Sequence, residues 1–190
     1  MAPTTRITAG EWRGRVIDTP RGMAIRPTRS LVRESLFNIL GERVVDADVI
    51  DLYAGAGTVG FEALSRGARG VTFVDRDGAS LHVIATTAQR LGCEQRCRIE
   101  RAEATTWLRR NADQVAGSDI VFVDAPYRDA DVDRALDLLG KHPPALVVCE
   151  HHAKRRVAER IGSLERVREA RHGLTTVTFL RRSTNGVNAS

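Results

Sequence analysis

The chain has 190 residues, 42% of them hydrophobic, and a formal net charge of +5. This length fits one domain with a sizeable core and a small appendage. No apolar stretch is long enough to span a bilayer, and the amino terminus lacks a charged-then-apolar signal, which argues against membrane and secreted proteins. We expect a soluble, cytoplasmic protein. Its three cysteines, Cys93, Cys97 and Cys149, lack Cys-x-x-Cys spacing, so we expect neither a disulfide framework nor a metal site.

The whole positive excess lies in residues 1–33, which contain seven arginines and only two acidic residues. The other residues balance, with 22 basic and 22 acidic side chains. Guanidinium is always charged and binds phosphate through two parallel hydrogen bonds, so this segment is typical of a nucleic-acid surface. The alternative is a solvated arm without a partner. The residues that we expect to contact RNA are Arg6, Trp12, Arg13, Arg15, Arg21 and Arg26.

The first elements follow from this segment in chain order. Residues 5–17 alternate polar and apolar side chains around a Gly-Glu turn, which predicts a basic β-hairpin. Trp12 stacks on a base or pins the hairpin to the domain. A break at residues 20–22 precedes a helix with Thr28 as its N-cap and Gly41 as its stop. Arg26 and Thr28 are expected to contact a cofactor or RNA, or to cap this helix. Its apolar face is formed by Leu31, Val32, Leu36, Ile39 and Leu40.

From residue 46 onward, strand and helix patterns alternate, which predicts a mostly parallel sheet covered by helices on both faces. The last two strands are too close for a parallel crossover, so they must run antiparallel. The expected strands are 49–52, 71–74, 96–99, 120–123, 145–149, 164–169 and 175–180, and the expected helices are 58–66, 78–91, 103–111, 131–140 and 153–161. The expected domains are a hairpin arm at 1–22, an α/β domain at 23–182 and a disordered tail at 183–190.

A glycine-rich loop after the first strand of this domain predicts a cofactor site. Gly55, Gly57 and Gly60 form G-x-G-x-x-G between a strand and a helix, with Asp75 ending the next strand, as in dinucleotide-binding folds. However, Asp51 directly before the loop would repel a pyrophosphate. S-adenosylmethionine carries an ammonium and a sulfonium instead, so Asp51 and the antiparallel end of the sheet favour a methyl donor over NAD.

The tetrapeptide Asp124-Ala125-Pro126-Tyr127 follows the apolar strand 120–123, at the sheet edge where such folds bind ligands. A carboxylate and a carbonyl can accept two hydrogen bonds from an exocyclic amine, while a tyrosine stacks on the ring that bears it. The alternative is an ordinary strand end. Glu150, His151 and His152 are interpreted as a polar loop rather than a metal site, since adjacent side chains on extended backbone point to opposite faces. His82 is expected to be satisfied or exposed on its helix.

These motifs resemble those of known enzymes. Residues 51–57, Asp75 and the pair Glu103-Ala104 resemble cofactor motifs of class I S-adenosylmethionine-dependent methyltransferases, and the tetrapeptide resembles the (Asp/Asn)-Pro-Pro-(Tyr/Phe) motif of those that methylate exocyclic amines of bases. The amino-terminal part adds family-specific strings at Arg6-Ile7, Gly10-Glu11-Trp12-Arg13-Gly14-Arg15, Arg26-Pro27-Thr28 and Arg33-Glu34-Ser35-Leu36-Phe37-Asn38. With these strings, residues 6–181 are similar to the RsmD family of bacterial 16S rRNA guanine-N2 methyltransferases. Ala125 departs from the first proline of that motif. The resemblance implies a doubly wound, mostly parallel seven-stranded sheet. It implies donor contacts at Asp51, Tyr53, Ala54, Gly55, Gly57, Asp75, Arg76, Glu103, Ala104 and Asp124.

The implied reaction is methyl transfer to a guanine N2 of 16S rRNA, naked or in the small subunit, by a monomer. Asp124 and the Ala125 carbonyl would hold the amine while Pro126 shapes the turn and Tyr127 stacks on the base, which is flipped out of its helix or already unpaired. Asp124 or water would accept the proton. Three alternatives remain open at this point, namely an adenine-N6 methyltransferase, an NAD-dependent oxidoreductase and a non-catalytic RNA-binding module.

Overall fold

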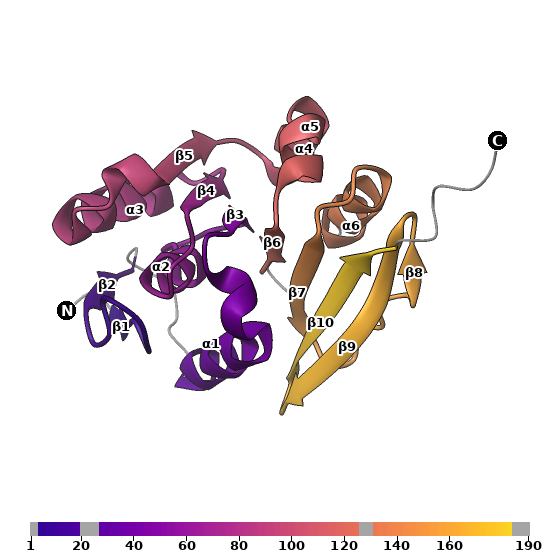
Figure 1. Cartoon of the computed structure of the whole chain (residues 1–190), viewed down its shortest axis with the longest axis horizontal. Coiled ribbons are helices and arrows are strands. Elements are labelled where there is room, and N and C mark those ends of the chain that lie inside the picture. Colours follow the sequence, from indigo (N-terminus) through magenta and orange to yellow (C-terminus); the bar gives the residue numbers. More distant parts are fainter. Residues whose placement is uncertain (1–3, 20–26, 126–130, 184–190) are drawn as a thin grey trace.

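A computed structural model describes residues 4–19, 27–125 and 131–183 of the chain. Within these ranges the strands form one two-stranded and one eight-stranded sheet. The order in the large sheet is β5-β4-β3-β6-β7-β10-β9-β8. The small sheet, β1 and β2, lies at one end of the molecule, and β8, β9 and β10 lie at the other (Figure 1). None of the described helices is both long and apolar enough to cross a bilayer.

Five neighbouring strands of the large sheet are parallel, as the alternating sequence predicts. In the four of these strands that lie inside the sheet, most apolar side chains are buried, and they lie on both faces, which is typical of parallel sheets that are covered by helices. These strands are β3 (Asp48–Leu52), β4 (Gly70–Asp75), β5 (Cys97–Arg101), β6 (Ile120–Val123) and β7 (Leu146–His152).

The remaining strands run antiparallel and confirm the expected end of the sheet. β9 (Leu164–His172) and β10 (Thr175–Arg182) pair through a two-residue turn, and β10 then pairs with β7. The two-residue strand β8 (Arg160–Ile161) pairs with β9 and makes the sheet eight-stranded rather than seven-stranded.

Helices cover both faces of the large sheet. One face, called the hairpin face below, packs against α1 (Pro27–Leu40), the 3-10 helix η1 (Gly41–Val44), α2 (Thr58–Ser65), α3 (Gly78–Leu91) and the β1–β2 hairpin. The other, called the α6 face, packs against α4 (Ala104–Arg110), α5 (Ala112–Gly117) and α6 (Asp131–Lys141). A short 3-10 helix, η2 (Glu94–Arg96), precedes β5. Each face therefore buries its own apolar cluster.

The amino-terminal hairpin forms as predicted. β1 (Thr4–Arg6) and β2 (Val16–Asp18) pair antiparallel, with Thr5 opposite Ile17. Ile7 extends the pairing, since its amide donates to the Arg15 carbonyl and its carbonyl accepts the Gly14 amide. The residues between Ile7 and Gly14 fold over α2, where the amide of Glu11 donates to the Ser65 carbonyl at 2.8 Å. The hairpin is thus anchored to the domain through its connecting loop.

Three sequence expectations were wrong in detail. Residues 153–161 are not a helix: the amide of Ala153 donates to the Leu174 carbonyl, and the segment ends in β8. On α1, Leu31 is 67% exposed, whereas Phe37 is buried and completes the apolar face. The helix begins at Pro27, so Thr28 lies within it rather than before it. The helix expected at 103–111 is confirmed as α4, and a second helix that the sequence did not predict, α5, follows it.

Candidate active site

The candidate site lies at the point where the strand order of the large sheet reverses, between β3 and β6. From β3 the chain builds β4 and β5 on one side, and β6 and β7 on the other. Leu52 of β3 pairs with Val74 on one side and with Val123 on the other, so the segments after these three strands meet at one edge. Ligands bind at such switch points in open α/β sheets. The topology therefore brings the glycine loop, Asp75 and the tetrapeptide together, as the sequence predicts.

Asp51 is the buried carboxylate of this edge. Its side chain is 2% exposed, and Oδ2 accepts a hydrogen bond from the Gly60 amide at 3.0 Å. Burial raises the pKa of Asp51 well above its usual value, and the negative charges of Asp124 and Asp75 raise it further, while the Gly60 amide lowers it. Three carboxyl groups therefore interact unfavourably at one place, and a cationic ligand would relieve that repulsion.

The loop after Asp51 adopts a backbone that few residues tolerate. Gly55 and Gly57 have φ angles of 54° and 73°, and Tyr53 adopts the same left-handed region at 61°. For a bulky residue this conformation costs on the order of 1–3 kcal/mol, which the surrounding structure must compensate. The Ala54 amide donates to the Val74 carbonyl at 3.1 Å, and the Gly57 amide donates to the Ala54 carbonyl at 2.7 Å. Such strain is concentrated at ligand-binding loops.

Asp75 joins this loop to the end of β4. Oδ2 accepts from the Gly55 amide at 2.7 Å and Oδ1 from the Asp77 amide at 2.9 Å. Each carboxylate oxygen has a second lone pair, so Asp75 can still accept hydrogen bonds from ribose hydroxyls. The neighbouring Arg76 is exposed.

Glu103, two residues after the end of β5, uses its carboxylate to cap a helix. It is the N-cap of α4 and accepts hydrogen bonds from the amides and hydroxyls of Thr105 and Thr106, at 2.7–3.0 Å. Burial opposes ionisation of Glu103, but these four hydrogen bonds outweigh it and lower the pKa to about 2. Ala104 follows as a buried residue of the first turn. Glu103 is therefore a fixed anion, and its capping role is one that its position before a helix could have revealed.

The tetrapeptide begins directly at the end of β6. Asp124 is half-buried and Ala125 is 4% exposed, so the Ala125 side chain packs inward. Pro126 and Tyr127 lie outside the described residues. The Asp124 charge acts on Asp51, which places the amine-binding candidate next to the cofactor candidate.

A hollow of about 340 Å³ opens beside Ala125, and sequence reasoning missed it. The prediction of a polar loop at Glu150, His151 and His152 is wrong, because these residues form the end of β7. His151 is buried, with Nε2 2.8 Å from the Thr178 hydroxyl, and burial lowers its pKa. The lining residues are Ala125, Val132, Glu150, His151, His152, Lys154 and Arg155.

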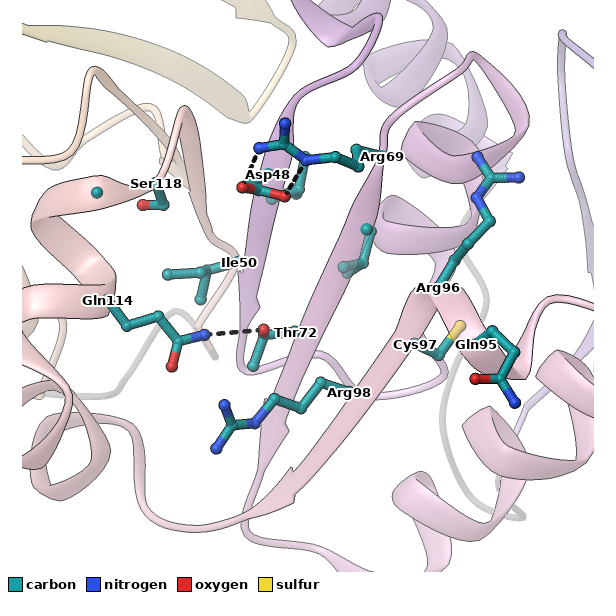
Figure 2. Close-up of a pocket in the computed structure, with 14 residues that line it drawn as sticks. Asp48, Ile50, Arg69, Thr72, Gln95, Arg96, Cys97, Arg98, Gln114 and Ser118 are labelled. Atoms are coloured by element: carbon teal, nitrogen blue, oxygen red, sulfur yellow. Dashed lines mark hydrogen bonds and ion pairs between the residues drawn. The ribbon is translucent and has the colours of Figure 1, made fainter.

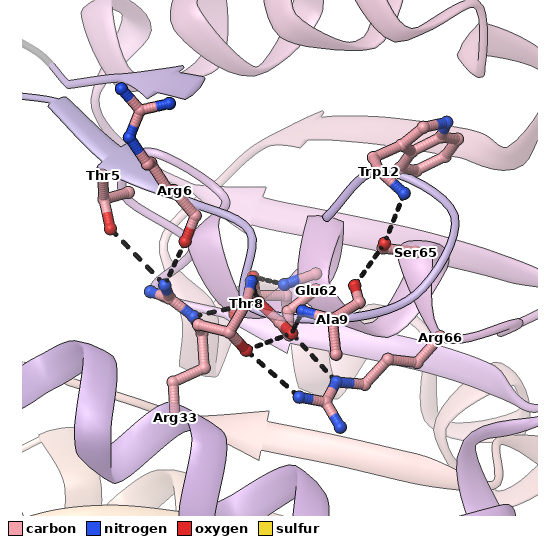
Figure 3. Close-up of polar contacts among 11 residues, drawn as sticks. Thr5, Arg6, Thr8, Ala9, Trp12, Arg33, Glu62, Ser65 and Arg66 are labelled. Atoms are coloured by element: carbon pink, nitrogen blue, oxygen red, sulfur yellow. Dashed lines mark hydrogen bonds and ion pairs between the residues drawn. The ribbon is translucent and has the colours of Figure 1, made fainter. Parts of the chain in front are cut away.

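A second network fixes the hairpin on the domain, and Glu62 of α2 is its centre (Figure 3). Glu62 is fully buried. Its two oxygens accept from the Thr8 amide and hydroxyl and from the Ala9 amide, at 2.6–3.1 Å. Two arginines neutralise it, Arg33 at 3.3 Å and Arg66 at 2.9 Å. One of the seven amino-terminal arginines is thus an internal partner rather than a surface group.

The predicted RNA-contacting residues separate into three groups. Arg6, Arg13 and Arg15 are exposed on the hairpin, where Arg6 donates to the Gly14 carbonyl at 2.8 Å. Trp12 is 8% exposed, its amide donates to the Ser65 hydroxyl, and the Arg96 guanidinium lies over its ring, which matches the alternative that Trp12 pins the hairpin. Arg21 and Arg26 lie outside the described residues.

Comparisons with known proteins identify relatives of this chain. A family model described as conserved hypothetical protein 95 matches residues 5–181. Ribosomal RNA small subunit methyltransferase D of Escherichia coli is 37% identical over 134 residues, which are 70% of this chain and 66% of that protein. YlbH of Bacillus subtilis, provisionally named an rRNA methyltransferase, is 30% identical over 181 residues, 93% of this chain and 98% of that one. The solved structure of yhhF from E. coli, provisionally named a methyltransferase, superposes with a TM-score of 0.80 at 31% identity, covering 95% of this chain and 99% of that one.

Proposed function

The chain belongs to the conserved hypothetical protein 95 family, to which the RsmD-like methyltransferases belong, and from this premise we propose that it transfers a methyl group from S-adenosylmethionine to the N2 amine of a guanine in 16S rRNA. The relatives support the methyl transfer and the rRNA substrate. The choice of guanine N2 rests on the tetrapeptide and on the family resemblance.

The observation that carries the proposal is the meeting of Asp51, Asp75 and Asp124 at the switch point. A dinucleotide would add a pyrophosphate to these three carboxylates, which is unfavourable at short range. S-adenosylmethionine instead adds an ammonium and a sulfonium. Asp75 has lone pairs left for the ribose, and the fixed Glu103 lies at the end of the neighbouring strand. The donor set therefore fits the methyl donor and not NAD.

The tetrapeptide explains how a poor nucleophile could react. The lone pair of the guanine amine is delocalised into the ring, so the amine attacks only when it is held in a pyramidal geometry. In the proposal, Asp124 and the Ala125 carbonyl accept its two hydrogens, which directs the lone pair at the methyl group. The new N–C bond forms as the C–S bond breaks, the sulfur keeps the electron pair, and the amine proton leaves to Asp124 or to water.

The proposed partner is 16S rRNA or the small subunit. In the proposal, the protein binds it as a monomer in the cytoplasm. The exposed arginines of the hairpin, Arg6, Arg13 and Arg15, would bind its phosphates, and the hollow beside Ala125 would give room for the nucleotide next to the target. A tyrosine at position 127 would then stack on the target base, as the motif predicts.

The cofactor half of the proposal is tested by calorimetry. We expect the protein to bind S-adenosylmethionine and S-adenosylhomocysteine and not to bind NADH. Binding of NADH alone would identify an oxidoreductase and refute the proposal.

The catalytic half is tested by Asp124→Ala. Because the amine loses the acceptor that orients it, we expect methyl transfer to fall at least about 100-fold. Binding of S-adenosylhomocysteine should remain within a few-fold of the wild-type value, which shows that the site is still folded. Asp113→Ala, an exposed carboxylate on α5, is the matched control and should react like the wild type. Equal turnover by the two variants would remove Asp124 from the mechanism.

A further inference from the structure

A hollow of about 500 Å³ lies on the hairpin face, away from the candidate active site. Its floor is apolar and is formed by buried side chains such as Ile120 of β6 and Phe179 of β10. Three arginines surround this floor: Arg43 from η1, Arg168 from β9 and Arg181 from β10, all exposed. We call it the arginine groove. Its lining consists of Ile39, Arg43, Asp119, Ile120, Ala145, Leu146, Val167, Arg168, Phe179 and Arg181.

The arginines of the groove have uncommitted guanidinium groups. Among the residues that the structure describes, none of the three forms a side-chain hydrogen bond or has a carboxylate within 4.0 Å. The one acid of the lining, Asp119, accepts the Asp48 amide at 2.8 Å. Other arginines of the large sheet and its connections are committed to carboxylates: Arg155 pairs with Asp133, and Arg166 pairs with Glu159 and Glu169.

Another hollow of similar size shows the same contrast. It lies at the amino ends of β3, β4 and β5 and is also lined by three arginines (Figure 2). There, however, Arg69 pairs with Asp48 and Arg98 pairs with Glu100. The third, Arg96, donates to the carbonyls of Leu64 and Ala68. These cations are used within the fold, whereas those of the arginine groove are available to a polyanion.

We propose that the arginine groove is a second RNA-binding surface, which holds a segment of the rRNA outside the target nucleotide. This inference rests on the proposed function, because it takes the substrate to be an RNA. Free guanidinium groups bind phosphate bidentately and stack on bases, and the apolar floor can receive a base or the flat side of a ribose. Val167, which is 48% exposed, extends this apolar surface at the rim.

The position of the groove favours the same RNA that enters the active site. The groove and the basic hairpin lie on the same face of the sheet, with α1 and η1 belonging to that face as well. Along β6, Ile120 of the groove floor and Asp124 are four residues apart, or about 13 Å at roughly 3.3 Å per residue. That distance is short compared with a folded rRNA segment, so an RNA whose target base reaches Asp124 is long enough to contact the groove as well.

The test is the binding of 16S rRNA by a triple variant, Arg43→Gln, Arg168→Gln and Arg181→Gln. The control is Arg109→Gln, Arg110→Gln and Lys141→Gln, which removes the same charge from the ends of α4 and α6 on the opposite face. We expect the groove variant to bind about tenfold or more weakly at ~0.15 M salt, with a salt slope smaller by about 2–3. The control should stay within about twofold, apart from the small long-range effect of net charge.

Two results would overturn the proposal, and a third would refute the proposed function without deciding the role of the groove. Equal losses in both variants would show that only net charge matters and would overturn it. Unchanged binding of naked rRNA with weaker binding of the whole small subunit would assign the groove to a ribosomal protein and would also overturn it. Wild-type protein that binds rRNA but transfers no methyl group refutes the proposed function instead, while the comparison of groove and control variants still decides the role of the groove. Unchanged S-adenosylhomocysteine binding shows that each variant is folded.

Discussion

At the scale of single residues, the candidate site is a set of carboxyl groups whose ionisation the fold makes unequal. Asp51 is buried and resists ionisation, whereas Glu103 is fixed as an anion by four hydrogen bonds. Two acids near one ligand site thus have opposite pKa shifts, a pattern that is common where a protein binds charged ligands. Asp51 is expected to ionise most readily when a cation is bound beside it.

This imbalance predicts a pH-dependent stability for the ligand-free protein. Since the folded pKa of Asp51 lies above the unfolded value of about 3.9, the folded state holds its proton more tightly. The stability that this proton contributes is complete below about pH 4 and is lost as pH rises through the folded pKa. Asp51→Asn does not titrate, and its carbonyl can still accept the Gly60 amide.

We therefore expect the melting temperature of Asp51→Asn, relative to the wild type, to rise as pH increases from about 5 to 8. Thermal unfolding without ligand measures this difference. A constant difference across that range would contradict the role given to burial. Asp113→Asn, exposed on α5, should show no such trend.

The motif residues of the site could be predicted from sequence, but their partners could not. Asp51, Asp75 and Asp124 each lie at or next to the carboxyl end of a strand in the same parallel sheet, so their meeting follows from local pattern and topology. Glu62 gave no such signal, because its partners Thr8 and Arg33 lie 54 and 29 residues away from it along the chain. Long-range pairing of charges is set by tertiary packing, which periodicity does not report.

At the scale of elements, the amino-terminal hairpin is preorganised rather than loosely attached. Glu62 satisfies two hairpin amides and one hydroxyl while two arginines neutralise its charge. Removing one partner of a buried ion pair leaves an uncompensated charge, at a cost of roughly 3–5 kcal/mol. The hairpin therefore presents Arg13 and Arg15 in a fixed place, so little entropy is lost when they bind.

Glu62→Gln should accordingly lower the free energy of unfolding by about 3 kcal/mol, as measured by urea denaturation. Glu100→Gln is the control, because Glu100 pairs with Arg98 at the surface, and such pairs contribute about 0–1 kcal/mol. Similar losses for the two variants would mean that the Glu62 network is no stronger than a surface ion pair.

The elements themselves were predictable to different degrees, and burial explains the difference. The run at 120–123 is apolar on every position and forms β6 within the predicted bounds. Residues 153–161 have high helix propensity but few apolar positions to bury, and hydrogen bonds to β9 and to the turn between β9 and β10 hold them in another conformation. On α1, Phe37 rather than Leu31 faces the core, where its ring lies 5.7 Å from that of Phe122. Partners of this kind are set by the tertiary fold.

At the scale of the whole molecule, the hairpin face of the sheet carries two groups of exposed arginines that have no carboxylate partner among the described residues. The hairpin supplies Arg13 and Arg15, and the arginine groove lies on the same face beyond α1. The sequence located the excess charge only in residues 1–33, because it could not show which of the other arginines are paired.

The hairpin contribution is tested by Arg13→Gln with Arg15→Gln. We expect weaker 16S rRNA binding and a salt slope smaller by about 1–2, because two phosphate contacts are lost. Stability should change by less than about 0.5 kcal/mol, since both side chains are exposed. Arg109→Gln with Arg110→Gln is the control. Unchanged affinity at low salt would show that the arm is not part of the RNA-binding surface.

The most direct test of the central claim is to map the methyl group. Small-subunit rRNA, naked or assembled, is incubated with the protein and labelled S-adenosylmethionine, and the modified nucleotide is identified by mass spectrometry. The account predicts one labelled guanine, modified at N2, with the label absent when Asp124→Ala replaces the wild type. Label on the N6 amine of an adenine, or none in either form of rRNA while the donor binds, would contradict it.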